Sequence, residues 1–217
     1  MKKFVQMLLV VCMVVFSAQV AFANYDNVTI QEGADITSVK RIDVAAPLYT
    51  PVDDKAPNKE MLTQIVSDAS RVSRSYVISY DAVAEGIKTA TNVDIKALDR
   101  RQAAKIYKEN VANYADAYVV LTVANNSRTT FFFDVFKAGT NELLYTYEIR
   151  ANKSEGDTVA TFNNLSEQFY KHFDRSADEQ LKENSKKKTY SETLICDMHS
   201  EQAKFQETEH FKEKMKQ

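Results

Sequence analysis

The sequence predicts an α/β (α+β) domain with a mixed sheet of about five strands packed by helices. Five stretches carry the apolar patterns of strands, and other stretches carry apolar residues every three or four positions, as in helices. The last three strand-like stretches are separated only by short polar turns, which predicts a three-strand antiparallel meander. A charged C-terminal helical tail is expected after the domain, because the apolar spacing fades while charged residues of both signs increase.

The first strand is predicted at residues 39–46, where side chains alternate between two faces. One face carries Ile42, Val44 and Ala46, and the other carries Arg41, Asp43 and Ala45. A loop at residues 47–57 holds all three prolines of the chain. Asn58 can then cap a helix by accepting a hydrogen bond from a free backbone N–H. Helical spacing links Met61, Leu62, Ile65, Val66, Ala69 and Val72.

Residues 75–79 predict a short buried strand, and two helices follow it. Asp81 can cap a brief helix, whose inward side chains are expected to be Val83, Ala84 and Ile87. Asp99, with Gln102 three residues later, matches a capping box. The helix that this box opens is expected to bury Ile106, Val111 and Tyr114.

The predicted meander comprises residues 118–123, 129–137 and 143–150. The first of these is almost continuously apolar, as expected of a central strand covered on both faces. The other two alternate, and one of their faces carries Phe131, Phe133 and Val135 with Tyr145, Tyr147 and Ile149. The opposite face carries Phe132 and Phe136, and we expect Leu144 beside them.

A long helix is predicted from about residue 158 to residue 181, with Asp157 as its cap. Its apolar positions are Val159, Phe162, Leu165, Phe169, Phe173, Ala177 and Leu181. Each large side chain contributes about 1.5–3 kcal/mol when buried, so this helix should pack on the sheet. The single domain is therefore expected at residues 38–181, between a flexible segment at residues 24–37 and a charged tail at residues 182–217.

Residues 1–23 have the pattern of a secretory signal peptide. Lys2 and Lys3 give a positive start, residues 4–16 are apolar apart from one glutamine, and a small–x–small box ends at Ala23. Cleavage after Ala23 would leave Asn24 as the first mature residue. A membrane-spanning helix is the alternative, but it requires about 20 apolar residues, and this run is shorter. The sequence therefore predicts export to the periplasm or the medium, with a mature chain that does not span the membrane.

The composition of the mature chain excludes several classes of function. Removal of residues 1–23 leaves 194 residues with a formal charge of −4, which argues against a nucleic-acid partner. Cys12 lies among valines rather than after a small residue, so a lipid anchor is not expected. Cys196 is then the only cysteine, so no intramolecular disulfide is possible, although a minor dimer linked through Cys196 is.

Three short segments carry a resemblance to a known group of domains. They are the strand at residues 39–44, the helix start at residues 81–85, and the alanine–aspartate–strand pattern at residues 114–120. The predicted order of elements over residues 39–173 resembles the small α/β domain of bacterial envelope proteins. That group includes the amino-terminal domain of the Tol-Pal propeller protein and the curli-export lipoprotein. This chain differs in having no lipobox and no β-propeller after the domain, so the resemblance implies a fold rather than a function.

No catalytic motif is found in the sequence, and each cluster of reactive residues has a simpler interpretation. Cys196 with His199 and His210 could bind a transition metal, but the spacing matches no zinc pattern, and a solvated tail explains it. His172 is expected at the boundary of the core. A charged cluster at one helix start comprises Asp94, Asp99, Arg100 and Arg101, and the helix dipole favours the carboxylates there. We therefore predict no catalytic residue, no cofactor and no metal.

The aromatic residues of the meander provide the remaining functional hypothesis. If helices leave one sheet face open, Phe132, Phe136 and Leu144 would form a surface for a partner, either another envelope protein or a second copy. A free sheet edge could also accept a partner strand. The sequence thus favours a non-catalytic binding or assembly module of the cell envelope. The alternative is an unrecognised periplasmic or secreted hydrolase, which a Ser–His pair or clustered carboxylates in the folded chain would favour.

Overall fold

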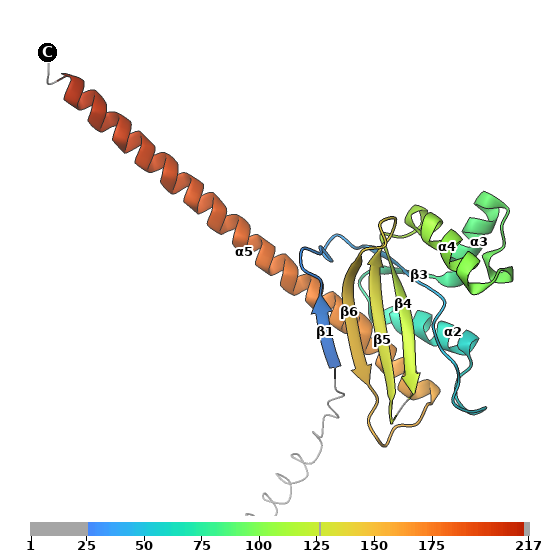
Figure 1. The fold of residues 1–217 in the computed structure, drawn as a ribbon. Coiled ribbons are helices and arrows are strands. Elements are labelled where there is room, and N and C mark those ends of the chain that lie inside the picture. The colour runs from blue at the N-terminus through green and yellow to red at the C-terminus, as the bar shows by residue number, and fades with distance from the viewer. Residues whose placement is uncertain (1–25, 126, 215–217) are drawn as a thin grey trace, which may run out of the picture.

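The computed structural model describes residues 26–125 and 127–214, with side chains described up to residue 188. It contains one six-stranded sheet with helices on both faces (Figure 1). The strands are β1 (Asp26–Ile30), β2 (Arg41–Val44), β3 (Tyr76–Ser79), β4 (Ala117–Asn125), β5 (Thr129–Lys137) and β6 (Leu143–Arg150). The α-helices are α2 (Lys59–Ala69), α3 (Tyr80–Thr91), α4 (Arg100–Asn110) and α5 (Val159–Lys214). Single 3₁₀ turns are η1 (Ser70–Val72), η2 (Ile95–Ala97) and η3 (Val111–Asn113).

The sheet is open and mixed, with the strand order β1-β6-β5-β4-β2-β3. β2 runs parallel to both β3 and β4, whereas the pairs β4–β5, β5–β6 and β6–β1 are antiparallel. The predicted α/β class and the β4–β5–β6 meander are confirmed. The sheet has six strands rather than about five, because β1 adds to the edge of the meander.

β1 replaces the flexible segment that the sequence analysis expected at residues 24–37. It pairs with β6 from Asp26 opposite Ile149 to Ile30 opposite Tyr145. A run of β-branched residues at 28–30 favours an extended strand. Gly33, at φ 79°, then provides a backbone conformation that turns the chain towards β2.

Helices α2 and α5 cover one face of the sheet and enclose the larger part of the core. The Phe169 ring stacks on Phe133 with 4.3 Å between ring centres, and the Phe162 ring meets Phe131 edge-on at 5.0 Å. The hydroxyl of Tyr170 donates to the carbonyl oxygen of Val66 in α2 at 3.1 Å, which satisfies a polar group in the apolar interior. The predicted docking of the long helix through its phenylalanines is therefore confirmed.

Helices α3 and α4 cover only part of the opposite face, over β2 and β4 (Figure 1). A second, smaller cluster of buried residues forms there: Ala45, Val83, Ala84, Ile87, Ile95, Tyr107, Val111, Ala115 and Tyr118. Among the described residues, β6 and β1 contribute nothing to this smaller core, and β5 contributes only Phe136, which packs against it. The outer three strands, β5, β6 and β1, are thus largely covered on one face only.

Two helix caps agree with the sequence analysis and two differ from it. Asn58 caps α2 by accepting from the Met61 N–H at 2.8 Å, and Asp99 caps α4 as predicted. Ser79, rather than Asp81, caps α3, because it lies at the end of β3 where the backbone is still extended. At the start of α5, the Thr158 hydroxyl accepts from the Thr161 N–H at 3.2 Å, whereas the predicted cap, Asp157, accepts a hydrogen bond from the Thr129 hydroxyl instead.

Helix α5 runs without a break through the predicted boundary between domain and tail. Its 56 residues correspond to a length of about 84 Å, and its carboxyl-terminal part extends away from the sheet (Figure 1). The Gln180 side chain fixes the loop after β1, accepting from the Ile36 N–H at 2.9 Å and donating to the Ala34 carbonyl at 2.6 Å. Leu181, predicted to be buried, is 55% exposed because it lies just beyond this contact.

β3 is an edge strand rather than the buried strand predicted at residues 75–79. Its only neighbour is β2, and Tyr76 is 70% exposed. Its attachment to the domain is strengthened by Arg74, whose backbone N–H donates to Asp174 at 2.8 Å and whose guanidinium donates to Asp178 at 2.9 Å. Among the described residues, no helix combines the length and the apolar character needed to cross a membrane.

Candidate functional site

The three residues predicted to form a partner surface lie in three different environments. Phe132 is half-buried on the helix-free face of β5. Phe136 stacks on Tyr118 at 5.3 Å and joins the smaller core. Leu144 is only 3% exposed and belongs to the larger core, so the prediction that it lies beside Phe132 is wrong.

A β-bulge explains the position of Leu144. The pairing of β5 with β6 shifts between Val135 and Phe136, so that Val135 is opposite Tyr145 while Phe136 is opposite Leu143. A bulge places an extra residue on one strand and breaks the two-residue alternation of faces. Leu144 is the extra residue, and its side chain therefore enters the core next to Tyr145.

The helix-free face around Phe132 is mostly polar. Thr146 donates to Asp134 at 2.8 Å, and Arg150 pairs with Glu148 at 2.6 Å. All five residues of β1 are exposed, and β6 is the one strand of the described residues that pairs with β1. This half of the sheet therefore presents an open face next to an unpaired strand edge, which the sequence analysis did not locate. The β-branched run at residues 28–30 was the signal that could have indicated the edge strand.

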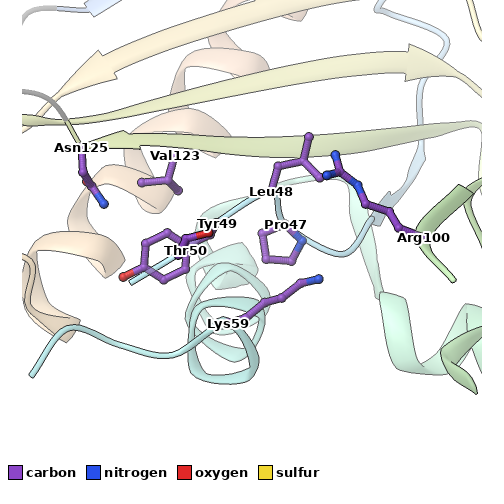
Figure 2. Close-up of a pocket in the computed structure, with 8 residues that line it drawn as sticks. All are labelled: Pro47, Leu48, Tyr49, Thr50, Lys59, Arg100, Val123 and Asn125. Carbon is purple, nitrogen blue, oxygen red and sulfur yellow. The ribbon is translucent and has the colours of Figure 1, made fainter. Parts of the chain in front are cut away.

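A groove of about 310 Å³ lies beside the carboxyl end of β4 (Figure 2). The chain after β2 continues along β4, with the Ala45 N–H donating to Val119 at 2.9 Å and the Leu48 N–H donating to Leu121 at 2.8 Å. The groove is lined by Pro47, Leu48, Tyr49, Thr50, Lys59, Arg100, Val123 and Asn125. It therefore lies where parallel strands end, a common position for ligand sites in α/β sheets.

The groove brings together residues from two helix starts, of which the sequence analysis considered only Arg100, as part of a charged cluster. Lys59 and Arg100 are the first residues of α2 and α4. Of the charged cluster predicted near residues 94–101, Asp94 accepts from the Lys96 N–H at 3.1 Å, and Asp99 caps α4. Those two carboxylates therefore serve local structure, whereas Arg100 faces the groove.

A second unusual feature is a buried carboxyl group beneath α4. Asp43 of β2 is fully buried, and the hydroxyl of Tyr107 donates to its carboxylate. Burial raises the pKa of Asp43 to about 7, although the hydrogen bonds from Tyr107 and from the Val44 N–H act in the opposite direction. The rings of Tyr80 and Tyr118 pack on Tyr107, at 6.0 and 5.6 Å between centres. Asp43 is enclosed and so has no access to a substrate, but it can change its charge near neutral pH.

His172 lies at the boundary of the core, as expected. Its ring stacks on Tyr147 at 5.0 Å, and its Nε2 lies 3.1 Å from Oδ2 of Asp26 in β1. Burial lowers the pKa of His172, although the charge of Asp26 acts in the opposite direction. Its contacts join α5 to the edge strand.

The side chains of Cys196, His199 and His210 lie outside the described residues, as do Ala23 and Asn24. In the part of the chain whose side chains are described, no three His, Cys, Asp or Glu residues are grouped to hold a metal.

No protein-family model matches the sequence, and no curated protein matches it. Among solved structures, the chain is similar to the PelC dodecamer from Paraburkholderia phytofirmans, with 10% identity over 67% of this chain and 98% of that chain, at a TM-score of 0.38. It is similar to the LpoB C-terminal domain from Escherichia coli, with 12% identity over 56% of this chain and 87% of that chain, at a TM-score of 0.40. A DUF4136 family protein from Bacteroides thetaiotaomicron is similar at 8% identity over 71% of this chain and 96% of that chain, with a TM-score of 0.37. These likenesses, each at 12% identity or less, concern the fold alone.

Proposed function

We propose that this chain is an exported envelope protein that acts as a non-catalytic binding module for another protein. The observation that carries the proposal is the outer edge of β1, which pairs with no other strand of the described residues and lies next to the helix-free face of the sheet. The signal-peptide pattern of residues 1–23 supports export. The partner would add an extended segment to β1, because an open strand edge offers backbone hydrogen bonds to a second strand.

The register of β1 identifies the backbone groups that are free to bind. The Gln31 N–H donates to the Leu144 carbonyl at 3.0 Å, and Thr29 lies opposite Thr146 two positions earlier. Successive residues of an antiparallel strand direct their backbone groups to alternate sides. Residue 29 therefore bonds to β6, whereas the N–H and C=O groups of Val28 point outward, away from β6.

The side chains next to this edge favour a partner segment of mixed character. Asn27 lies opposite Glu148, and Glu148 lies opposite Phe132, so the three form one row across β1, β6 and β5. This row lies on the helix-free face, where a half-buried aromatic ring is flanked by polar groups. A partner would bury Phe132 and hydrogen-bond to the row, and aromatic residues of this kind are common anchors in protein interfaces.

Substitution at Val28 tests the proposal without disturbing the β1–β6 ladder. Proline at an outward-facing position removes the donor for an added strand but no hydrogen bond to β6. A photo-cross-linking residue at position 27 should give one discrete adduct with a partner protein in intact cells. Val28→Pro should abolish the adduct, whereas Val28→Ala, which keeps the N–H, should retain it. Equal adduct yields from the two variants, at equal thermal stability, would contradict strand addition at this edge.

A further inference from the structure

The groove beside β4 has the chemistry of an anion site, and we propose that it binds a small molecule carrying a phosphate or carboxylate group. Its volume of about 310 Å³ lies at the lower end of the range for small-molecule sites. The proposal goes beyond the protein-binding function, because the groove involves neither β1 nor the helix-free face.

The first argument is the charge of the lining. Lys59 and Arg100 both line the groove, and its lining within the described residues includes no carboxylate. Among the described residues, neither Lys59 nor Arg100 forms an ion pair, whereas Lys88 and Lys96 nearby pair with Asp94 and Asp81 at 3.1 and 2.5 Å. Figure 2 shows the Lys59 and Arg100 side chains at one end of the groove, on either side of Pro47. Two cations that line one groove without an ion pair among the described residues attract an oxyanion, and the guanidinium fork of arginine suits phosphate and carboxylate geometry.

The second argument is the presence of buried polar atoms that lack partners. Within the described residues, the hydroxyl oxygen of Tyr49 and Oδ1 of Asn125 are buried and have no hydrogen-bond partner. Both residues line the groove, at the end opposite Lys59 and Arg100 (Figure 2). A buried polar atom without a partner costs free energy, so the lining at this end of the groove is polar and incompletely satisfied.

The third argument is that the walls of the groove are already fixed in place. The Leu48 carbonyl accepts from the Val123 N–H at 3.1 Å, which fixes the apolar floor to β4. The Tyr49 ring packs edge-on against Phe162 of α5, with 5.8 Å between ring centres. A site with fixed walls loses little conformational freedom on binding, which favours affinity.

These features also set the orientation of the ligand. Burial, followed by the charges of Asp157 and Asp53, raises the pKa of the Tyr49 hydroxyl, so this end of the groove disfavours a second anion. The anionic group therefore belongs between Lys59 and Arg100. The remainder of the ligand would cover Pro47 and Leu48 and extend toward Tyr49 and Asn125.

The test compares two double variants of equal charge. Lys59→Gln with Arg100→Gln removes both cations of the groove. Lys55→Gln with Arg101→Gln removes two exposed cations nearby that do not line it. Binding of inorganic pyrophosphate to the purified full-length chain is followed by backbone amide chemical shifts. We expect saturable shifts at Tyr49, Thr50 and Asn125.

The groove variant should weaken pyrophosphate binding about ten-fold or more, as expected from the loss of two charge-assisted contacts, while the control variant should bind as the parent does. Equal weakening in both variants would mean that net charge alone explains the effect, and it would overturn the proposal. The absence of saturable shifts with pyrophosphate or citrate at millimolar concentration would also overturn it. Sedimentation with phosphatidylglycerol vesicles distinguishes a lipid headgroup from a free compound. If the parent sediments with the vesicles and the groove variant does not, the anion is a headgroup. If shifts occur without sedimentation, it is a free compound.

Discussion

Replacement of Asp43 by asparagine should stabilise the protein at alkaline pH and have little effect at acid pH. Asp43 is fully buried under α4, and its carboxylate accepts a hydrogen bond from Tyr107. Asparagine has nearly the same shape and keeps an oxygen that can accept this bond, but it has no charge to bury. The variant therefore separates the cost of burying the ionised carboxylate from the packing of the side chain.

The size of the effect follows from the pKa of Asp43, which burial raises from 3.8 to about 7. Because the folded state holds the proton more tightly than the unfolded state, this group contributes fully to stability below pH 3.8. The contribution is lost as the pH rises through about 7. At ~1.4 kcal/mol for each pH unit between the two pKa values, the loss amounts to about 4 kcal/mol above pH 7.

Urea unfolding of the parent and of Asp43→Asn, at acid and at alkaline pH, measures this loss. The difference in unfolding free energy between the two proteins should be small at about pH 4 and should rise to several kcal/mol in favour of the variant above about pH 7. Other titrating groups, such as His172, are present in both proteins and cancel in the difference. A difference that is the same at both pH values would refute the reasoning, because Asp43 would then titrate alike in folded and unfolded chains.

Three further predictions concern the core and the two ends of the chain. Phe169→Ala should lower the unfolding free energy by about 3–5 kcal/mol, since Phe169 is fully buried on Phe133. Lys171→Ala should have little effect, because it loses only an exposed ion pair. Equal small effects of the two substitutions in thermal melts would contradict this prediction. The native protein should begin at Asn24, which amino-terminal sequencing checks; a chain that begins at Met1 and stays in the inner membrane would overturn the signal peptide. Cys196 should give a minor disulfide-linked dimer on non-reducing electrophoresis. The Cys196→Ser variant should lose this dimer and keep its fold. Loss of fold in the variant, or zinc that purifies with the parent protein, would instead show that the tail is a structural site.

Local patterns predicted most of the fold because strands and helices follow the periodicity of apolar residues. The alternation of Ile42 and Val44 with Asp43 placed each side chain on the face that it occupies. Leu144 could not be placed in this way, since a bulge depends on how two distant strands pair rather than on the sequence of either one. β1 was missed for a similar reason: a short polar strand becomes ordered only through its pairing with β6.

The candidate sites were harder to predict, because they depend on contacts between residues far apart in the chain. Lys59 and Arg100 are 41 positions apart in the sequence and lie at the starts of two different helices. Each is ordinary in its own helix, and only the path of the chain along β4 brings them to one groove. Likewise, an aspartate in an alternating strand predicts a solvated side chain, and the sequence does not show that Tyr107 will cover it.

The position of the two proposed surfaces in the sheet makes them independent of each other. The groove adjoins β4 and β2, whereas β1 forms the far edge, with β5 and β6 between. Three strand spacings separate β1 from β4, a distance of about 14 Å, and no residue lines both surfaces. At such separations the effects of substitutions add rather than couple. A change at Val28 should therefore leave anion binding intact, and a change at Lys59 should leave strand addition intact. A failed result for one surface thus leaves the argument for the other unchanged.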